Sequence, residues 1–346
     1  MLEAYSTNAT VAKIRAIYGS MLTKDDLREM VAKRSVSEVA DYLKRTPRFS
    51  EALRDIDPNT VQRGFLESAL SRYAFDSYIK LCSFQRLDEK PFFRFYVHSM
   101  ECQQMINLVN AICNGLSREY VEALPGYLLK HSRIRFLELA RCKSFDELLP
   151  GLRGSPYYKP LCSVARNEDG RPDFTDAEFR IRTSYYSDLM ESVKESFGGN
   201  ERTELEALIK GDIDTINIIN SLRLKKYFGY NAEDIKLLML PFTGTGKRRM
   251  EDIYSTEDAE HMIAKIKQTR FGKYIDEGGD SNDIERSLRY NRYRQMRHTI
   301  VKSTSTPVVM YSFMYICDTE IRNIIRIIEG VRYDVDPALI YKLLVV

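Results

Sequence analysis

The sequence predicts an all-α protein made of three copies of one helical unit. Apolar residues recur at the i, i+3, i+4, i+7 spacing of an amphipathic helix along most of the chain, and prolines and glycines separate these stretches. Convincing alternation of apolar and polar residues, which a half-buried strand requires, is missing. Four short signatures recur in one order at a period of about 110 residues, which indicates internal triplication. The helical stretches are residues 9–21, 25–33, 36–45, 61–85, 92–114, 203–228, 257–268, 283–302 and 308–329.

The first signature is an acid or amide followed three residues later by asparagine. This spacing puts both polar side chains on one face of a helix. The three copies align without gaps, and the arrangement suits hydrogen bonding from one helix to another. The pairs are Gln104 with Asn107, Asp214 with Asn217, and Glu320 with Asn323.

The second signature marks the start of a short helix. A residue type that caps helix N-termini stands between two apolar residues at the spacing of a hydrophobic staple. The predicted caps are Thr23, Ser117, Asn231 and Asp336. Pro337 then occupies the first helical position, where its missing N–H is not needed.

The third signature is a short amphipathic helix that ends in a turn. It recurs at residues 35–49, 144–158 and 258–271, with apolar residues in the same order each time. In the third copy one residue is missing at the position where the first two copies have proline.

The fourth signature opens a long helix with a glutamate, an aliphatic residue three later and an aromatic residue eight later. Acids at equivalent positions of three repeats argue against catalysis, because catalysis needs carboxylates held in different environments. We therefore predict no catalytic, cofactor-binding or metal-binding residues, and we interpret the repeated polar residues as structural contacts between repeats. These residues are Glu67, Asn107, Glu178, Asp214, Asn217, Glu285, Glu320 and Asn323.

The signatures divide the chain into repeats at residues 1–97, 98–207 and 208–346. The helix from Pro307 onward carries the signature that starts a repeat. We therefore expect each unit to borrow a helix from its neighbour and the last helix to close the arrangement. The prediction is a body with pseudo-three-fold symmetry and a central cavity.

The composition argues against several classes of function. The 346 residues are 44% hydrophobic, which is enough for two or three cores, and 52 Lys and Arg nearly balance 49 Asp and Glu. A net charge of +3 is small for a dedicated nucleic-acid binder. The six cysteines form no CxxC pair and only four histidines occur, so the spacing of zinc ligands is absent. We expect reduced, mostly buried cysteines in a cytosolic protein without a cofactor.

Two motifs allow other interpretations. Gly244–Lys247 resembles part of a phosphate loop, but Pro241 and Arg248 stand where a Walker A motif needs glycine and Ser or Thr, so a turn between helices is favoured. Residues 285–297 interleave arginine with tyrosine, a pattern that can bind RNA. A solvated basic helix face is the favoured interpretation, and a face bound to an acidic protein is the third.

The sequence predicts no direct bilayer insertion. The N-terminus carries charges at positions 3, 13 and 15 and lacks the apolar segment of a signal peptide. No window of about 18 uncharged apolar residues occurs in the chain. Any membrane location is therefore expected to come through a partner.

Five segments, in their order along nearly the whole chain, resemble the C subunit of the bacterial and archaeal V/A-type ATPases, which corresponds to the d subunit of the eukaryotic vacuolar enzymes. The ordered set carries the resemblance rather than any single motif. One departure is the run GTGKRR at 244–249, which is more basic than the family pattern. The segments are YSTNATVAKIRAIYGSMLTKDDLREMV at 5–31, SVSEVADYLKRTPRFSEAL at 35–53, GDIDTINIINSLRLKKYFGYNAEDI at 211–235, LLMLPFTGTGK at 237–247, and EIRNIIRIIEGVRYDVDPALIYKLL at 320–344.

The resemblance implies a non-catalytic, funnel-shaped subunit of the central stalk, part of the rotor. It would receive the central shaft subunits in its cavity and sit on the membrane ring of proteolipid subunits, peripheral on the cytoplasmic face. It would thereby couple shaft to ring during ATP-driven ion pumping or ATP synthesis. On its own the chain is expected to be a monomer. The alternatives are an α-helical repeat adaptor that binds other proteins, a helical enzyme and an RNA-binding protein.

Overall fold

The chain is helical throughout the part that the structure describes. The computed structural model covers residues 2–58, 62–275 and 281–346. Within these ranges the only β pairing is an isolated bridge between Arg166 and Pro172. The all-α prediction is therefore confirmed.

The chain divides into two compact units. One unit consists of Met1–Leu87 together with Lys267–Val346, and the other consists of Asp88–Ile266. The first unit thus joins the two ends of the chain. The division into three repeats around a cavity stays a prediction.

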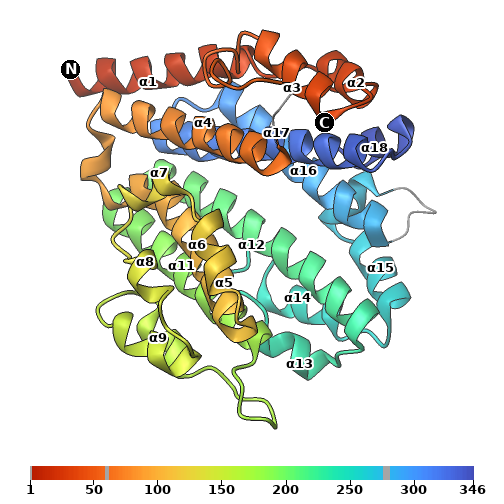
Figure 1. Cartoon of the computed structure of the whole chain (residues 1–346). Coiled ribbons are helices and arrows are strands. Elements are labelled where there is room, and N and C mark those ends of the chain that lie inside the picture. Colours follow the sequence, from red (N-terminus) through yellow and green to blue (C-terminus); the bar gives the residue numbers. More distant parts are fainter. Residues whose placement is uncertain (1, 59–61, 276–280) are drawn as a thin grey trace. The chain divides into compact units, whose positions relative to one another are not determined.

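The first unit is built from helices of both chain ends, which are red to orange and blue in Figure 1. Its elements are α1 (Leu2–Gly19), α2 (Lys24–Val31), α3 (Val36–Arg45), α4 (Arg63–Phe84), the 3₁₀ helix η3 (Arg270–Tyr274), α16 (Ser281–Lys302), α17 (Thr306–Arg332) and α18 (Pro337–Lys342).

The helix α17 lies at the centre of this unit. It packs against α1, α2, α3, α4, α16 and α18. Its sequence explains this position, because apolar residues occur on nearly every side of it and a helix of that kind is stable only when it is buried. Pro307 stands in the first turn of α17, where its fixed φ suits a helix start.

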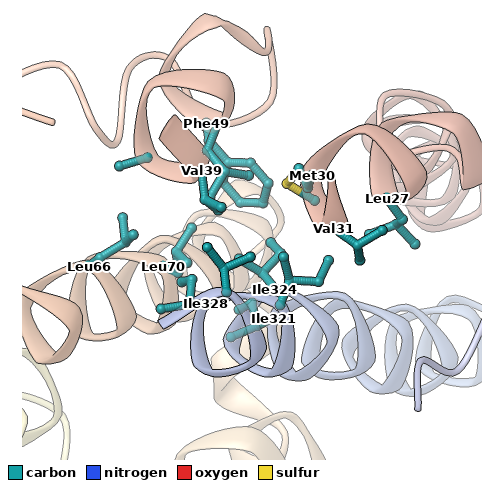
Figure 2. Close-up of a cluster of buried hydrophobic side chains, with 14 of the residues drawn as sticks. Leu27, Met30, Val31, Val39, Phe49, Leu66, Leu70, Ile321, Ile324 and Ile328 are labelled. Atoms are coloured by element: carbon teal, nitrogen blue, oxygen red, sulfur yellow. The ribbon is translucent and has the colours of Figure 1, made fainter. Parts of the chain in front are cut away.

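The apolar core of the first unit forms where α17 meets the N-terminal helices (Figure 2). Ile321, Ile324 and Ile328 lie about one turn apart on α17 and face side chains from α2, α3 and α4. Ile324 and Phe49 are fully buried. The core therefore depends on contacts between the two ends of the sequence.

A glycine sets the distance between α17 and α18. A Cβ atom on Gly330 would lie 2.5 Å from Cγ1 of Ile340, which is buried against it. The absence of a side chain at Gly330 lets the C-terminal helix pack close to α17.

The end of α16 is held by an arginine from α1. Arg15 donates through Nε to the carbonyl of Ile300 at 3.0 Å and through Nη2 to those of Val301 and Ser303 at 3.0 and 2.8 Å. These carbonyls lie in the last turn of α16 and just after it, where the helix leaves them without partners. The positive charge also suits the negative end of the helix dipole.

The second unit contains long helices and a series of short ones. The 3₁₀ helix η1 (Leu87–Glu89) and the helix α15 (Ala259–Lys267) lie at its two boundaries with the first unit. Its other elements are the 3₁₀ helix η2 (Pro91–Arg94), α5 (Phe95–Asn114), α6 (Ser117–Ala123), α7 (Gly126–Leu129), α8 (Phe136–Leu139), α9 (Phe145–Gly151), α10 (Tyr158–Cys162), α11 (Phe174–Ser196), α12 (Gly199–Phe228), α13 (Ala232–Leu237) and α14 (Lys247–Tyr254).

Aromatic packing holds the start of α5 to the end of α11. The ring of Phe92 lies 5.2 Å from that of Phe95 and 5.3 Å from that of Phe197, measured between centroids. Phe93 lies 6.2 Å from Phe197. Offset and edge-to-face pairs of this kind add to the burial of the rings themselves.

Most of the predicted helix caps are confirmed. Thr23 and Asp26 form a reciprocal capping box at α2, and the side chains of Asn231 and Asp336 cap α13 and α18. The cap predicted at Ser117 is wrong, because α6 begins at Ser117 and its side chain makes no cap bond.

The chain geometry before α6 explains this difference. Gly115 ends α5 in the left-handed conformation, with φ of 70°, and Leu116 donates its N–H back to the carbonyl of Ala111. Gly115 and Leu116 are the only residues between α5 and α6, and both take part in this turn. Leu116 rather than Ser117 therefore occupies the N-cap position of α6.

Shortening Ile324 should destabilise the first unit. We expect Ile324→Ala to lower the free energy of unfolding by about 3 kcal/mol, because it removes buried methyl groups and leaves a cavity. Leu339→Ala is the matched control, since Leu339 is 50% exposed on α18. Urea titration measures both variants, and equal losses would contradict this packing.

Candidate functional site: buried polar anchors on the long helices

Glu320 on α17 binds two separate segments from the start of the chain. Its Oε1 accepts the backbone N–H of Leu22 at 2.8 Å, and its Oε2 accepts Nε–H of Arg48 at 2.5 Å. The side chains of Arg48 and Glu320 are 3% and 8% exposed, so this is a buried ion pair. The guanidinium also lies 5.5 Å from the ring centroid of Tyr73 on α4. One polar group thus joins several elements of the first unit.

Burial controls the ionisation of this pair. It raises the pKa of Glu320 above its ordinary value, and the positive charge of Arg48 opposes that rise only in part. Burial is the largest influence on the pKa of Arg48 and would lower it, but the charge and hydrogen bond of Glu320, together with smaller contributions from Cys317 and Tyr73, more than offset burial and raise that pKa. Loss of the glutamate would therefore leave a buried positive charge without its partner.

Asp214 on α12 holds the loop between α13 and α14. This side chain is fully buried. Its Oδ1 accepts the hydroxyl of Thr243 at 2.5 Å and the N–H of Gly244 at 3.1 Å, and its Oδ2 accepts the hydroxyl of Thr245 at 2.6 Å. Consecutive residues of one loop are therefore ordered around a single carboxylate.

Asn217 and Asn323 make the same pair of hydrogen bonds in the two units. Asn217 donates Nδ2–H to the carbonyl of Leu240 and accepts its N–H, both at 2.9 Å. Asn323 does the same with Val345, at 2.8 and 3.0 Å. Each asparagine thus pairs with the N–H and the carbonyl of one later residue. That residue lies 23 positions after Asn217 and 22 positions after Asn323. This is a direct structural counterpart of the first sequence signature.

The middle copy of that signature is arranged differently. Asn107 lies exposed on α5 and accepts Nε2–H of Gln103, one turn away on the same helix, at 3.0 Å. The buried acid of α5 is Glu101, which accepts the N–H of Arg133 at 3.1 Å. The first signature did not identify Glu101. It aligns Asn107 with Asn217 and Asn323 without gaps, and this places Gln104 rather than Glu101 at the position of the acid. Its position among buried residues such as Cys102 is the signal that would have found it.

Three of the buried acids in the described part of the chain, Glu101, Asp214 and Glu320, make the same kind of contact. Each comes from a long helix and accepts a backbone N–H just before a short helix begins. These residues stand one or two positions before the N-cap of the short helix, so their N–H groups lie outside the helix and need a partner from elsewhere. The contact occurs on α5, α12 and α17, although Glu101 lies one turn before Gln104, the residue that the first signature aligns with Asp214 and Glu320. The pairs are Glu101 with Arg133 before α8, Asp214 with Gly244 before α14, and Glu320 with Leu22 before α2.

The glutamates of the fourth signature lie on partly exposed helix faces. Each forms an ion pair with an arginine one turn away on its own helix, and exposed pairs of this kind contribute little to stability. In one case the arginine, Arg63, also reaches Glu329 on α17 at 2.5 Å, which connects α4 to α17. The pairs are Glu67 with Arg63, Glu178 with Arg182, and Glu285 with Arg289.

The two motifs with alternative interpretations have structural partners inside the chain. The threonines on either side of Gly244 donate their hydroxyl hydrogens to Asp214. The element before this loop is the helix α13, whereas a phosphate loop follows a strand. Within the stretch 285–297, Arg286 donates to the carbonyl of Lys342 and Arg297 to the hydroxyl of Tyr18. These contacts fit a turn and a helix face with structural roles.

Two cysteines at the centre of the long helices have the properties of packed thiols. Burial raises the pKa of Cys102 and of Cys317 to about 12, so both stay protonated near neutrality and are poor nucleophiles. Among the described residues no group of three or more His, Cys, Asp and Glu side chains is placed to hold a metal ion.

The long helices, their buried anchors and the order of the segments point to one family. The family model described as ATP synthase (C/AC39) subunit matches residues 10–343. The chain belongs to this family. The resemblance read from the sequence is therefore confirmed, and the chain is a member of a family of ATP synthase subunits.

Curated relatives are similar over almost their whole length. A protein of Desulfurococcus sp., named as the C subunit of A-type ATP synthase, is 25% identical over 96% of this chain and 88% of its own. Proteins with the same name from Thermococcus onnurineus and Pyrococcus furiosus are 25% and 23% identical, over 96% and 94% of this chain and 88% and 86% of their own. Within the described residues, none of the helices has the length and apolar character needed to cross a bilayer.

Removing the buried carboxylate of Glu320 should strongly destabilise the protein. We expect Glu320→Ala to lower the free energy of unfolding by about 3 kcal/mol or more, because Arg48 then stays buried without its counter-charge. Glu178→Ala is the matched control, since its ion pair is partly exposed, and should change stability by about 0.5 kcal/mol or less. Denaturant titration measures both. A small effect of Glu320→Ala would rule out the anchoring role.

The stability of the second unit should depend on pH through His98. Burial and the nearby charges of Arg94 and Arg133 lower the pKa of His98 from 6.5 to about 4. The unfolded chain therefore binds a proton more readily than the folded chain between these values, so acidification favours unfolding.

Lowering the pH from about 7 to about 4.5 should reduce the stability of the wild type by about 2 kcal/mol more than that of His98→Gln, which cannot take up this proton. Urea titrations at the two pH values measure this difference, with exposed His298→Gln as the control variant. Parallel pH profiles for wild type and His98→Gln would disprove it.

Proposed function

We propose that this chain is the non-catalytic central-stalk subunit of a V/A-type rotary ATPase or ATP synthase. In this proposal it is a rotor socket that couples the central shaft to the membrane proteolipid ring, during ATP-driven ion pumping or ATP synthesis. Membership of the ATP synthase (C/AC39) subunit family over residues 10–343 carries the proposal. The archaeal relatives named as the C subunit of A-type ATP synthase support it. The subunit would be peripheral, held at the cytoplasmic face by the complex.

In a rotor socket, the buried anchors would stiffen the body that transmits torque. Torque passes through a body without loss only if its helices do not slide along one another. Close packing resists such sliding, and directional hydrogen bonds add to this resistance. Hydrogen bonds from Glu320, Asn323, Asp214 and Asn217 fix the register between long helices and loops within each unit. A chain stiffened in this way suits a rotor part.

We further propose that residues 1–97, 98–207 and 208–346 form three repeats around a central cavity that receives the shaft. The repeated contact of a buried acid with the start of a short helix supports this proposal. In it, the polar residues of the first and fourth signatures stabilise each repeat and its junction with the next. An α-helical adaptor with other protein partners is the second candidate, and family membership favours the socket.

Removing this subunit should uncouple ATP hydrolysis from ion transport. We expect a complex assembled in vesicles without the chain to lose ATP-driven ion uptake, because no part then transmits torque from shaft to ring, while the catalytic portion continues to hydrolyse ATP. Ion uptake measured with a fluorescent indicator and phosphate release measured in parallel separate the two activities.

Adding back the purified chain should restore uptake, and adding heat-denatured chain should not. A tagged chain should also recover shaft and ring subunits from solubilised membranes. Uptake that persists without the chain would exclude the socket role.

A further inference from the structure

One segment of the second unit carries an unusual concentration of positive charge. Residues 223–249, from the end of α12 to the first turn of α14, contain seven lysines and arginines against two acids, a local charge of +5. This exceeds the charge of +3 for the entire chain, so the remainder is net acidic. We call this segment the basic hairpin. Its cations are Arg223, Lys225, Lys226, Lys236, Lys247, Arg248 and Arg249.

The basic hairpin also exposes large apolar side chains. Phe228 at the end of α12 is 69% exposed, Leu237 at the end of α13 is 73% exposed, and Tyr227 is 59% exposed. Because α12, α13 and α14 pack against one another, these side chains and the cations of α14 belong to one local structure. Exposed aromatic side chains flanked by lysine and arginine are typical of surfaces that enter the headgroup region of a bilayer.

A strained residue extends this surface. Phe242 has φ of 70°, a left-handed conformation that is rare for a bulky side chain, and its side chain is partly exposed. The backbone on one side of it is fixed by Asn217, which pairs with Leu240, and on the other side by Asp214. Two buried anchors therefore maintain the strain. Phe242 thus adds a partly exposed aromatic side chain to the loop that leads into the basic start of α14.

The corresponding places after α5 and α17 lack the charge. There, exposed apolar side chains occur too, including Leu116, Val121 and Leu339. The corresponding residues 113–139 contain four lysines and arginines against three acids, and residues 329–346 contain two against three. Exposed apolar residues are thus common to the three hairpins, whereas the basic charge is particular to residues 223–249.

We propose that the basic hairpin binds an anionic phospholipid surface. Lys247, Arg248 and Arg249 contact the phosphate groups, and the side chains of Phe228, Leu237 and Phe242 enter the headgroup layer. Each cation near an anionic membrane and each buried apolar group contributes to such binding. A fluid lipid surface also requires no matching shape. The contact is separate from the socket role, and it departs from the expectation that membrane location comes only through a partner.

Vesicle flotation with the purified full-length chain tests the proposal without other ATP synthase subunits. We expect the wild type to float with vesicles of phosphatidylcholine and phosphatidylglycerol and to stay unbound with phosphatidylcholine alone. The triple variant Lys247→Gln, Arg248→Gln, Arg249→Gln should bind the anionic vesicles on the order of a hundredfold more weakly. Phe228→Ser with Leu237→Ser should also weaken binding, and the remaining binding should be more sensitive to salt.

The matched control removes the same charge elsewhere in the second unit. Arg141→Gln, Lys143→Gln, Arg153→Gln changes three exposed cations and should bind as the wild type does. All altered side chains are exposed, so unchanged melting curves establish that each variant is folded. Absence of wild-type binding to anionic vesicles would overturn the proposal and leave an acidic protein as the partner. Equal losses in the control and the test variant would overturn it as well, because the binding would then follow net charge alone.

Discussion

The structure depends on the requirement that a polar group buried in a helical core must be paired. An unpaired buried carboxylate or amide is unfavourable by several kcal/mol, roughly as much as a large apolar side chain contributes through burial. The helix α17 can be surrounded on all sides only because Glu320 and Asn323 find partners from other parts of the chain. The same condition applies to α12 with Asp214 and Asn217.

This requirement also explains why the two chain ends form one unit. Apolar contacts such as those of Ile324 drive α17 against the N-terminal helices, but the hydrophobic effect itself has no preferred direction. The ion pair with Arg48 and the bond to Leu22 are directional, so they fix one position. Burial thus provides most of the driving force, and the polar contacts select a single arrangement.

Much of the local structure could be predicted from sequence, because periodicity and capping are encoded by neighbouring residues. The short helices α3 and α9 lie where the third signature predicts them. The sequence singles out Asp214 and Glu320 because they recur at equivalent positions. Their partners could not: Arg48 is 272 residues from Glu320, and no local pattern records that contact. Asn107 shows the opposite problem, because it matches the signature but faces outward.

The buried anchors recur on the long helices, whereas the surface segments that they bind differ in sequence. The carboxylate of Asp214 is satisfied by the hydroxyls of Thr243 and Thr245 and by the backbone N–H of Gly244. Phe242 can then adopt a strained and exposed conformation, because the bonds on either side of it offset the strain. A fixed interior is thereby compatible with surface segments that differ in charge, as residues 223–249 differ from the corresponding residues after α5 and α17.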